Sequence, residues 1–268
     1  MISLPSPPKI IDKKDNLAVF EIEGLSPGYG VTIGNSLRRV LLSSLPGAAV
    51  TQVKIKGVPH EFSTIPGVME DTITILLNLK QLRFKLYAEE PQEAKLQIKG
   101  TKTVKGANFT LPSQVELMNQ DAHVATLTDK KAELDIIILI EKGMGYEPVE
   151  LRKKGKLETG TIALDAIFTP VRKVSYRVEN MRVGERTDFD RLILELETDG
   201  TLTPEEAFSQ ASETLIKHFA LFEETFKKLP VSEVPAAKEK KKPQKKVKKV
   251  SAKKPKKHAQ AKKRKKTK

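Results

Sequence analysis

The sequence contains neither cysteine nor tryptophan, and only 5% of its 268 residues are aromatic. Without cysteine the chain has no disulfide framework and no thiolate-ligated metal site, which fits a reducing compartment. The longest uninterrupted apolar run covers residues 136–140, far short of the ~20 residues that cross a bilayer. The first nine residues carry prolines and lack the apolar core of a signal peptide. We therefore expect a cytoplasmic protein without membrane contact.

Positive charge is concentrated near the C-terminus. The formal net charge is +14, yet residues 238–268 hold 18 basic residues and one glutamate, so the part before them is mildly acidic. This lysine-rich segment has no apolar periodicity, a composition that favours disorder. We expect it to attract DNA or RNA without sequence specificity, and a solubilising extension is the alternative. The side chains on which this prediction rests are Lys245, Lys246, Lys253, Lys254, Lys262, Lys263 and Arg264.

Residues 28–44, GYGVTIGNSLRRVLLSS, combine a glycine turn with an apolar helical stripe. Gly28 and Gly30 suit a turn with unusual backbone angles. Gly34 costs about 1 kcal/mol relative to alanine inside a helix, which makes sense where another backbone must come close. The pair Pro46-Gly47 ends the helix. Side chains at helical spacing then form one apolar face: Ile33, Leu37, Val40, Leu41 and Leu45.

Arg38 and Arg39 are adjacent in this helix, so they diverge by about 100° and cannot both lie on the apolar stripe. Two solvated arginines on a surface helix are one interpretation. The other is that at least one of them anchors a partner, because arginine is enriched at interface hot spots.

The rest of the chain predicts an α+β fold in which strands dominate the middle. A helix is expected at 70–80, with Met69, Ile73, Leu76 and Leu77 on its apolar side. Residues 182–191 form a dense mixed-charge cluster, which indicates either a solvated loop or a polar interface rim. Alternating or apolar runs predict strands at 17–23, 51–56, 82–88, 94–99, 134–140, 162–168, 171–179 and 191–198.

The clearest predicted helix follows Thr203, where the residues TPEE match a capping box with proline at the first helical position. Glu213 and Lys217 are spaced as a favourable pair one turn apart, as are Glu223/Lys227 and Glu224/Lys228. The apolar stripe packs either inside its own domain or against a second copy of the chain. It comprises Phe208, Ala211, Leu215, Phe219, Phe222, Phe226 and Leu229.

Several segments occur in the order seen in one known family. Residues 28–44, 60–80, 145–150, 175–201 and 204–226 together resemble the alpha subunit of bacterial RNA polymerase, and the likeness extends over residues 15–228. The resemblance implies a discontinuous dimerisation subdomain with two long helices, residues 1–47 plus 170–229. It also implies an inserted β-rich subdomain at 48–169. Residues 230–268 would be a disordered lysine-rich tail.

The resemblance further implies an assembly platform with no active site. In such a family the subunit homodimerises and docks the beta and beta prime subunits, and omega and sigma join the complex. No cofactor would bind this chain, and the Mg²⁺ of catalysis would belong to another subunit. The implied dimer interface comprises Ile33, Leu37, Val40, Leu41, Phe208, Leu215, Phe219, Phe222 and Phe226. The implied beta contacts are Arg38, Arg39, Glu61, Glu70, Asp71, Arg182, Arg186 and Asp188, and the beta prime contacts are Val171, Val174 and Tyr176.

Three alternatives stand beside this interpretation. Scattered histidines and the Asp188/Asp190 pair are weak signals for an enzyme or a metal site. A nucleic-acid-binding ribosomal or chromatin-type protein would explain the basic segment but not the mildly acidic remainder. An archaeal or eukaryotic polymerase homologue fits less well because cysteine is absent. The lysine-rich segment stands where most bacterial members carry a separate DNA-binding domain, so we do not expect recognition of upstream promoter DNA of the usual kind.

Overall fold

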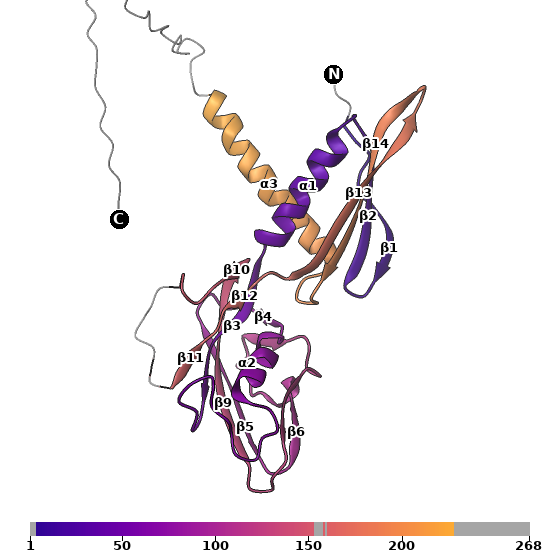
Figure 1. Cartoon of the computed structure of the whole chain (residues 1–268). Helices are drawn as coiled ribbons and strands as arrows, with labels where there is room; N and C mark the ends of the chain where they lie inside the picture. The colour runs from indigo at the N-terminus through magenta and orange to yellow at the C-terminus, as the bar shows by residue number, and fades with distance from the viewer. Residues whose placement is uncertain (1–3, 153–157, 159, 228–268) are drawn as a thin grey trace, which may run out of the picture. The chain divides into compact units, whose positions relative to one another are not determined.

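The computed structural model describes residues 4–152, 158 and 160–227 (Figure 1). The chain divides into two units, Met1–Glu224 and Thr225–Lys268. Every element below belongs to the first unit except the last residues of the C-terminal helix. The first unit holds two main hydrophobic cores, each built on its own antiparallel sheet.

The first sheet has four strands in the order β1-β2-β14-β13, and two helices pack against it (Figure 1). Alternating burial along β2 places Ala18, Phe20 and Ile22 under the helices. Leu37 and Leu41 meet them from the first helix, and Ala207 and Ala211 from the last. The elements are β1 (Lys9–Lys14), β2 (Leu17–Leu25), α1 (Tyr29–Ser43), β13 (Val171–Val183), β14 (Arg186–Thr198) and α3 (Pro204–Lys227).

The second sheet follows the order β5-β9-β3-β4-β7, with β11 also paired to β3. Helix α2 packs into its core, where Ile75 and Leu79 are fully buried with Phe84, Leu96 and Ile136. The strands are β3 (Pro46–Ile55), β4 (Phe84–Leu86), β5 (Gln92–Lys99), β7 (Val115–Leu117), β9 (Glu133–Met144) and β11 (Thr161–Ala163). The remaining elements are α2 (Thr72–Lys80), β6 (Lys102–Lys105) with β8 (His123–Leu127), η1 (Gly106–Asn108), and β10 (Tyr146–Glu147) with β12 (Ala166–Ile167).

The α+β class is confirmed, and several predicted elements need correction. The single strand expected at 162–168 is two short strands, β11 and β12, which belong to different sheets. The charged segment 182–191 is not a loop, because β13 runs to Val183 and β14 starts at Arg186 with a tight turn between them. Strand β1 was not predicted, since all six of its residues are exposed and leave no alternating pattern.

The apolar face predicted for the 70–80 helix was also wrong. Leu76 is buried as expected, but Ile75 and Leu79 are its buried neighbours. Met69, Ile73 and Leu77 are 75%, 36% and 54% exposed. The apolar residues of TITILLNLK are spread over more than half of the helix circumference, so periodicity could not choose the face that the sheet covers.

Glycines let α1 lie close to the sheet. Gly28 has a φ of 83°, as the turn prediction required, whereas Gly30 lies in the first turn of α1 and does not have a positive φ. At Gly34 an added Cβ would lie 2.7 Å from Tyr176 Cδ2 and 2.9 Å from Leu192 Cδ1. The neighbours of this helical glycine are therefore side chains of β13 and β14, not the close backbone that the sequence led us to expect.

Candidate interaction surfaces

Helix α1 starts at a cap supplied from far along the chain. Its N-cap residue Gly28 has no capping side chain of its own. Asp190, on β14, supplies the acceptor: its Oδ2 accepts hydrogen bonds from the backbone N–H of Gly28 at 2.9 Å and of Gly30 at 3.0 Å. A carboxylate at this end also complements the helix dipole. Asp190 is only 6% exposed, so this cap is an internal feature of the fold.

The two adjacent arginines are both exposed on α1, which agrees with the prediction that they cannot both lie on the apolar stripe. Within the described part of the chain neither Arg38 nor Arg39 forms an ion pair with an acidic side chain. The opposite side of the helix is committed to the core, because Leu37 and Leu41 are 4% and 0% exposed. Ile33 and Val40 are partly buried against the same core. The helix therefore presents charge outward over a packed apolar base.

The predicted stripe of α3 divides into a covered half and an open half. Phe208 stacks on Phe20 with ring centroids 4.7 Å apart, and Leu215 packs at the edge of the core. Phe219 and Phe222 are 60% and 55% exposed and meet edge to face at 6.4 Å.

Two further apolar side chains of α3 are exposed and were not predicted: Ile216 flanks the stripe, and Leu221 lies on another side of the helix, about 100° from Phe222. The side chain of Phe226 lies outside the described residues, as does Leu229.

The start of α3 confirms the predicted capping box. Glu206 N–H donates to Thr203 Oγ1 at 3.3 Å, and Thr203 N–H donates to Glu206 Oε2 at 3.1 Å. Lys217 and Glu213 form the expected ion pair at 2.8 Å. The partners predicted for Glu223 and Glu224, namely Lys227 and Lys228, have side chains outside the described residues.

Glu70 and Asp71 hold the loop before α2 in place. Glu70 Oε2 accepts the N–H of Thr126 at 2.6 Å, and its Oε1 lies 2.8 Å from His123 Nε2. Asp71 caps α2 by accepting the N–H of Thr74 at 2.9 Å. Hydrogen bonding from Thr74, through its side chain first and then its backbone N–H, lowers the pKa of the Asp71 carboxyl. Both carboxylates therefore stabilise the fold itself, in addition to any contact with a partner. Glu61, earlier in the loop, is half-buried, and its neighbour Phe62 is 75% exposed.

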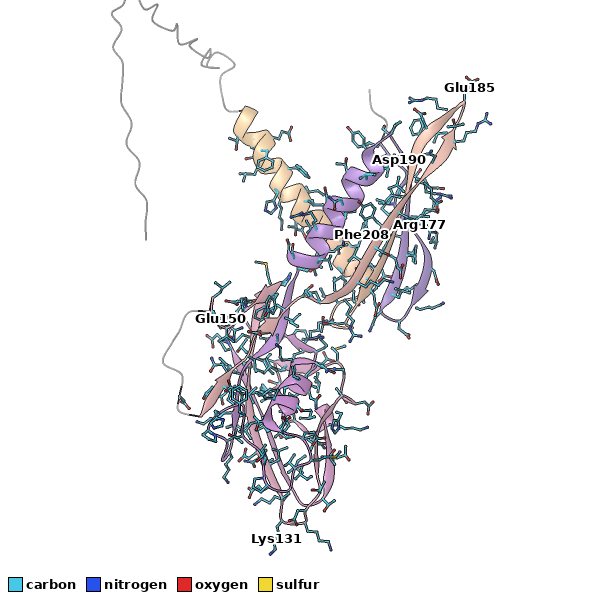
Figure 2. The ribbon with its side chains drawn as sticks, viewed as in Figure 1. Lys131, Glu150, Arg177, Glu185, Asp190 and Phe208 are labelled. Carbon is cyan, nitrogen blue, oxygen red and sulfur yellow. The ribbon has the colours of Figure 1, made fainter. Side chains whose placement is uncertain are left out.

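The β13–β14 hairpin is charged to its tip, where Glu185 lies (Figure 2). Arg186 binds Asp188 with two hydrogen bonds, Nε to Oδ1 at 3.0 Å and Nη2 to Oδ2 at 2.6 Å. The Arg186 guanidinium lowers the pKa of Asp188 and also lies 5.0 Å from the ring centroid of Phe189. Arg182 is exposed and donates to the carbonyl of Gly184.

The three residues assigned to beta prime lie on β13, mostly facing inward. Val171 and Val174 are 3% and 8% exposed and belong to the core under α1. Tyr176 is partly buried against Gly34. Between them Arg172 and Lys173 are exposed. The exposed side of β13 is therefore positively charged, and Val171, Val174 and Tyr176 pack its other side against the core.

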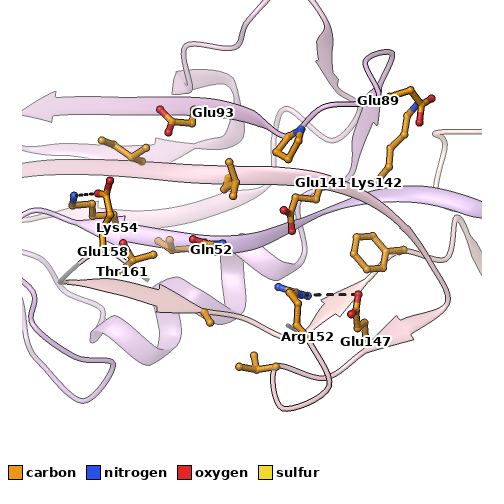
Figure 3. Close-up of a pocket in the computed structure, with 17 residues that line it drawn as sticks. Gln52, Lys54, Glu89, Glu93, Glu141, Lys142, Glu147, Arg152, Glu158 and Thr161 are labelled. Atoms are coloured by element: carbon orange, nitrogen blue, oxygen red, sulfur yellow. Dashed lines mark hydrogen bonds and ion pairs between the residues drawn. The ribbon is translucent and has the colours of Figure 1, made fainter. Parts of the chain in front are cut away.

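A cavity of about 550 Å³ lies beside β3 and β9 and is lined by charges of both signs (Figure 3). Lys54 pairs with Glu158 at 2.8 Å, and Arg152 lies 3.9 Å from Glu147. Arg152 Nη1 donates to the carbonyls of Thr51 and Leu164, both at 3.2 Å. Arg152 therefore links β3 to the segment that follows β11. None of the residues predicted for a site lines this cavity.

Among the described residues, no cluster of three or more histidine or acidic side chains is arranged to hold a metal ion. No helix within that same part of the chain is long and apolar enough to cross a membrane. The basic side chains of the C-terminal segment, from Lys245 to Arg264, lie outside the described residues.

Comparison with known proteins adds a consistent set of relatives. Residues 53–169 match the family described as the RNA polymerase Rpb3/RpoA insert domain. The chain is 47% identical over 212 residues to the DNA-directed RNA polymerase subunit alpha of Oceanobacillus iheyensis, covering 79% of this chain and 67% of that one. The protein of the same name from Syntrophomonas wolfei is 47% identical over 232 residues, covering 86% and 73%. The subunit alpha of Roseiflexus sp. is 47% identical over 210 residues, which cover 78% of this chain and 64% of that one. The chain thus spans about two thirds of the length of these relatives.

Proposed function

This chain belongs to the family of bacterial DNA-directed RNA polymerase alpha subunits, whose N-terminal domain it matches, and we propose that it homodimerises and scaffolds the beta and beta prime subunits. The observation that carries the proposal is the open half of α3. Ile216, Phe219 and Phe222 are each more than half exposed along this part of the helix.

Covering such side chains is favourable. Burying a large apolar side chain contributes about 1.5–3 kcal/mol, and contiguous exposed apolar surface commonly marks an interaction site. A helix presenting this face packs well against the same face of a second copy, because a two-fold interface is self-complementary. Leu37 and Leu41 would then contribute from below, by holding α1 on the sheet, since they are buried within their own chain.

Docking of the beta subunit rests on the outward charges. Arg38 and Arg39 are exposed and without ion-pair partners in the described residues, so a carboxylate on a partner would gain a pair without breaking an existing one. Glu61, Glu70, Asp71 and the hairpin residues Arg182, Arg186 and Asp188 complete the proposed beta surface. The beta prime subunit would meet β13, which Val171, Val174 and Tyr176 support.

In this proposal the chain performs no chemistry. Transcription would be catalysed by the large subunits with their own Mg²⁺, and omega and sigma would join the same complex. The lysine-rich C-terminal segment would hold DNA or RNA without reading sequence, through its phosphates. The protein would act at the nucleoid in the cytoplasm.

Light scattering of the full-length chain tests the dimer. We expect twice the chain mass for the wild type and a monomer for the double variant Phe219→Glu/Phe222→Glu. Met144→Glu is the matched control, because Met144 is 65% exposed and belongs to β9, not to α3. A wild-type monomer, or a double variant that stays dimeric, would contradict the proposal.

Capture of purified beta subunit tests the scaffold. Arg39→Ala is expected to keep the fold and the dimer but to weaken beta capture, whereas Lys130→Ala removes one positive charge from an exposed turn and leaves capture unchanged. Wild-type yield of assembled core enzyme with Arg39→Ala would count against the role of that arginine. A wild-type chain that ignores beta but binds DNA would favour the basic-tailed nucleic-acid binder instead.

A further inference from the structure

The β13–β14 hairpin extends past the sheet from which it arises. Strand β14 pairs with β2 only as far as Asp190, which lies opposite Leu25. Beyond that pair, the strand pairing of residues 181–189 lies within the hairpin, as far as the turn at Glu185. Figure 2 shows Asp190 at the base of this arm and Glu185 at its end. A two-stranded ribbon without further neighbours is only marginally ordered by itself, so its direction depends on contacts at the base.

Asp190 makes those contacts with α1. Its single oxygen Oδ2 binds the N–H groups of both Gly28 and Gly30, and the side chain is almost completely buried. Gly30 is needed for this approach, because an added Cβ would lie 3.0 Å from the Asp190 side chain and 2.7 Å from Val178 Cγ1. A second contact at the base is weaker: Gly24 N–H meets Met181 Sδ at 3.1 Å.

The other helices are capped from nearby in the chain. Helix α2 is capped by Asp71 and α3 by Thr203 with Glu206. The cap of α1 comes from a residue 160 positions away, on the strand that carries the hairpin. A local cap would have stabilised the helix equally well. What the distant cap adds is a fixed relation between the helix and the hairpin arm.

We propose that Asp190 is a positioning residue for docking of the large subunits. It joins α1, which carries Arg38 and Arg39, to the hairpin that carries Arg182, Arg186 and Asp188, so that both segments meet a partner in one orientation. This inference rests on the proposed function, because it assumes that these two segments form the docking surface. Asp190 itself touches no partner, since it is buried.

Two variants separate the positioning role from simple loss of fold. Asp190→Ala removes the acceptor, and Asp190→Asn retains an oxygen that can accept both N–H groups while removing the charge. Asp12→Ala is the control, because it removes an exposed carboxylate from the same sheet. Each full-length variant is examined for mass by light scattering, for amide hydrogen exchange, and for affinity to purified beta subunit.

With Asp190→Ala we expect amides of residues 28–34 and 181–189 to exchange about tenfold faster or more, since hydrogen bonds to a charged group are lost. Exchange of the core strand residues 192–196 and the dimer mass should stay unchanged, while beta affinity falls about tenfold. Asp190→Asn should stay within about threefold of the wild type in both amide exchange and beta affinity. The control Asp12→Ala should match the wild type.

Faster exchange with unchanged beta affinity would overturn the positioning role and leave the proposed function standing. Unchanged amide exchange in Asp190→Ala would show that the hydrogen bonds from Gly28 and Gly30 to Asp190 do not hold the helix and the hairpin arm together, and would overturn the inference. A wild-type chain that does not capture beta would overturn the proposed function and the positioning role with it, whatever the exchange measurement gives.

Discussion

Arg83 Nε lies 3.6 Å from Asp199 Oδ2, and the two side chains are only 19% and 5% exposed. Arg83 follows α2, beside the six-stranded sheet, and Asp199 begins the turn from β14 into α3. Burial lowers the pKa of Arg83, and the Asp199 charge opposes that shift. Asp199 Oδ1 also accepts two hydrogen bonds from Thr201. One shielded ion pair therefore joins the two sheets of the first unit.

Removing Arg83 should destabilise the fold. Arg83→Met leaves the Asp199 carboxylate buried without its cation, and we expect a loss of about 2–3 kcal/mol in the free energy of unfolding. Denaturation followed by circular dichroism measures it, because tryptophan is absent. Adding Asp199→Asn should restore part of the loss, since the stranded charge is then gone. An additive double variant would contradict a direct interaction.

Gly34→Ala should destabilise the protein although alanine favours a helix by about 1 kcal/mol. The new methyl group would contact Tyr176 and Leu192 at less than 3 Å, and overpacking of this kind costs about 1–3 kcal/mol. We expect a lower urea midpoint for Gly34→Ala. The exposed neighbour gives the control, because Asn35→Ala should leave the midpoint equal or slightly higher.

Stability should fall in acid through Glu70. Burial disfavours the charged form, but the N–H of Thr126 and the ring of His123 outweigh it, so the pKa of Glu70 lies below its ordinary value of 4.5. A carboxyl group with a lowered pKa stabilises the fold above its unfolded pKa and loses this contribution as the pH falls through the folded value. The melting temperature should therefore decline below pH 4.5 more steeply in the wild type than in Glu70→Gln.

The glutamine variant keeps an acceptor for Thr126 and cannot titrate, so at pH 7 it should lose only about 1 kcal/mol. Glu93→Gln, at an exposed position on β5, controls for removal of a surface carboxylate. Parallel acid profiles for wild type and Glu70→Gln would contradict the assignment.

Deleting residues 238–268 should flatten the salt dependence of DNA binding. Each neutralised phosphate contributes about 0.9 to the slope of log K against log salt, so a segment contacting about five phosphates accounts for about 4.5. A shuffled segment of equal composition should retain the full slope, since the attraction is electrostatic. An unchanged slope after deletion would rule out the nucleic-acid role.

Local signals were enough for the elements with strong periodicity. The capping box at Thr203, the stripe beginning at Ile33, and strands such as β2 and β5 were predicted directly from residue spacing. The buried face of α2 was not, because its apolar residues are spread over more than half of the helix circumference. The 182–191 hairpin was missed because charged residues in an exposed ribbon carry no apolar alternation.

For the candidate interaction surfaces too, some features were predictable from the sequence and others required the tertiary structure. Helix geometry alone excludes that Arg38 and Arg39 both lie on the apolar stripe, because adjacent residues diverge by about 100°. That both are exposed was decided by the packing of Leu37 and Leu41 against the sheet. The structural role of Glu70 and the burial of Val171 and Val174 depended on which strands lie beside them. Asp71, in contrast, caps α2 through the N–H of Thr74 three residues later, which is a local signal. The division into subdomains and the proposed partner contacts stay predictions.

The sequence by itself determined the family of the chain, from the order of its motifs. It also determined the α+β class and the amphipathic character of α1 and α3, since these depend on residues close together along the chain. Only the tertiary structure decided that Asp190 caps α1 from 160 positions away and that Arg83 pairs with Asp199. It also divided the α3 stripe into a covered and an open half. Such relations depend on which distant segments pack together, and no local pattern records that choice.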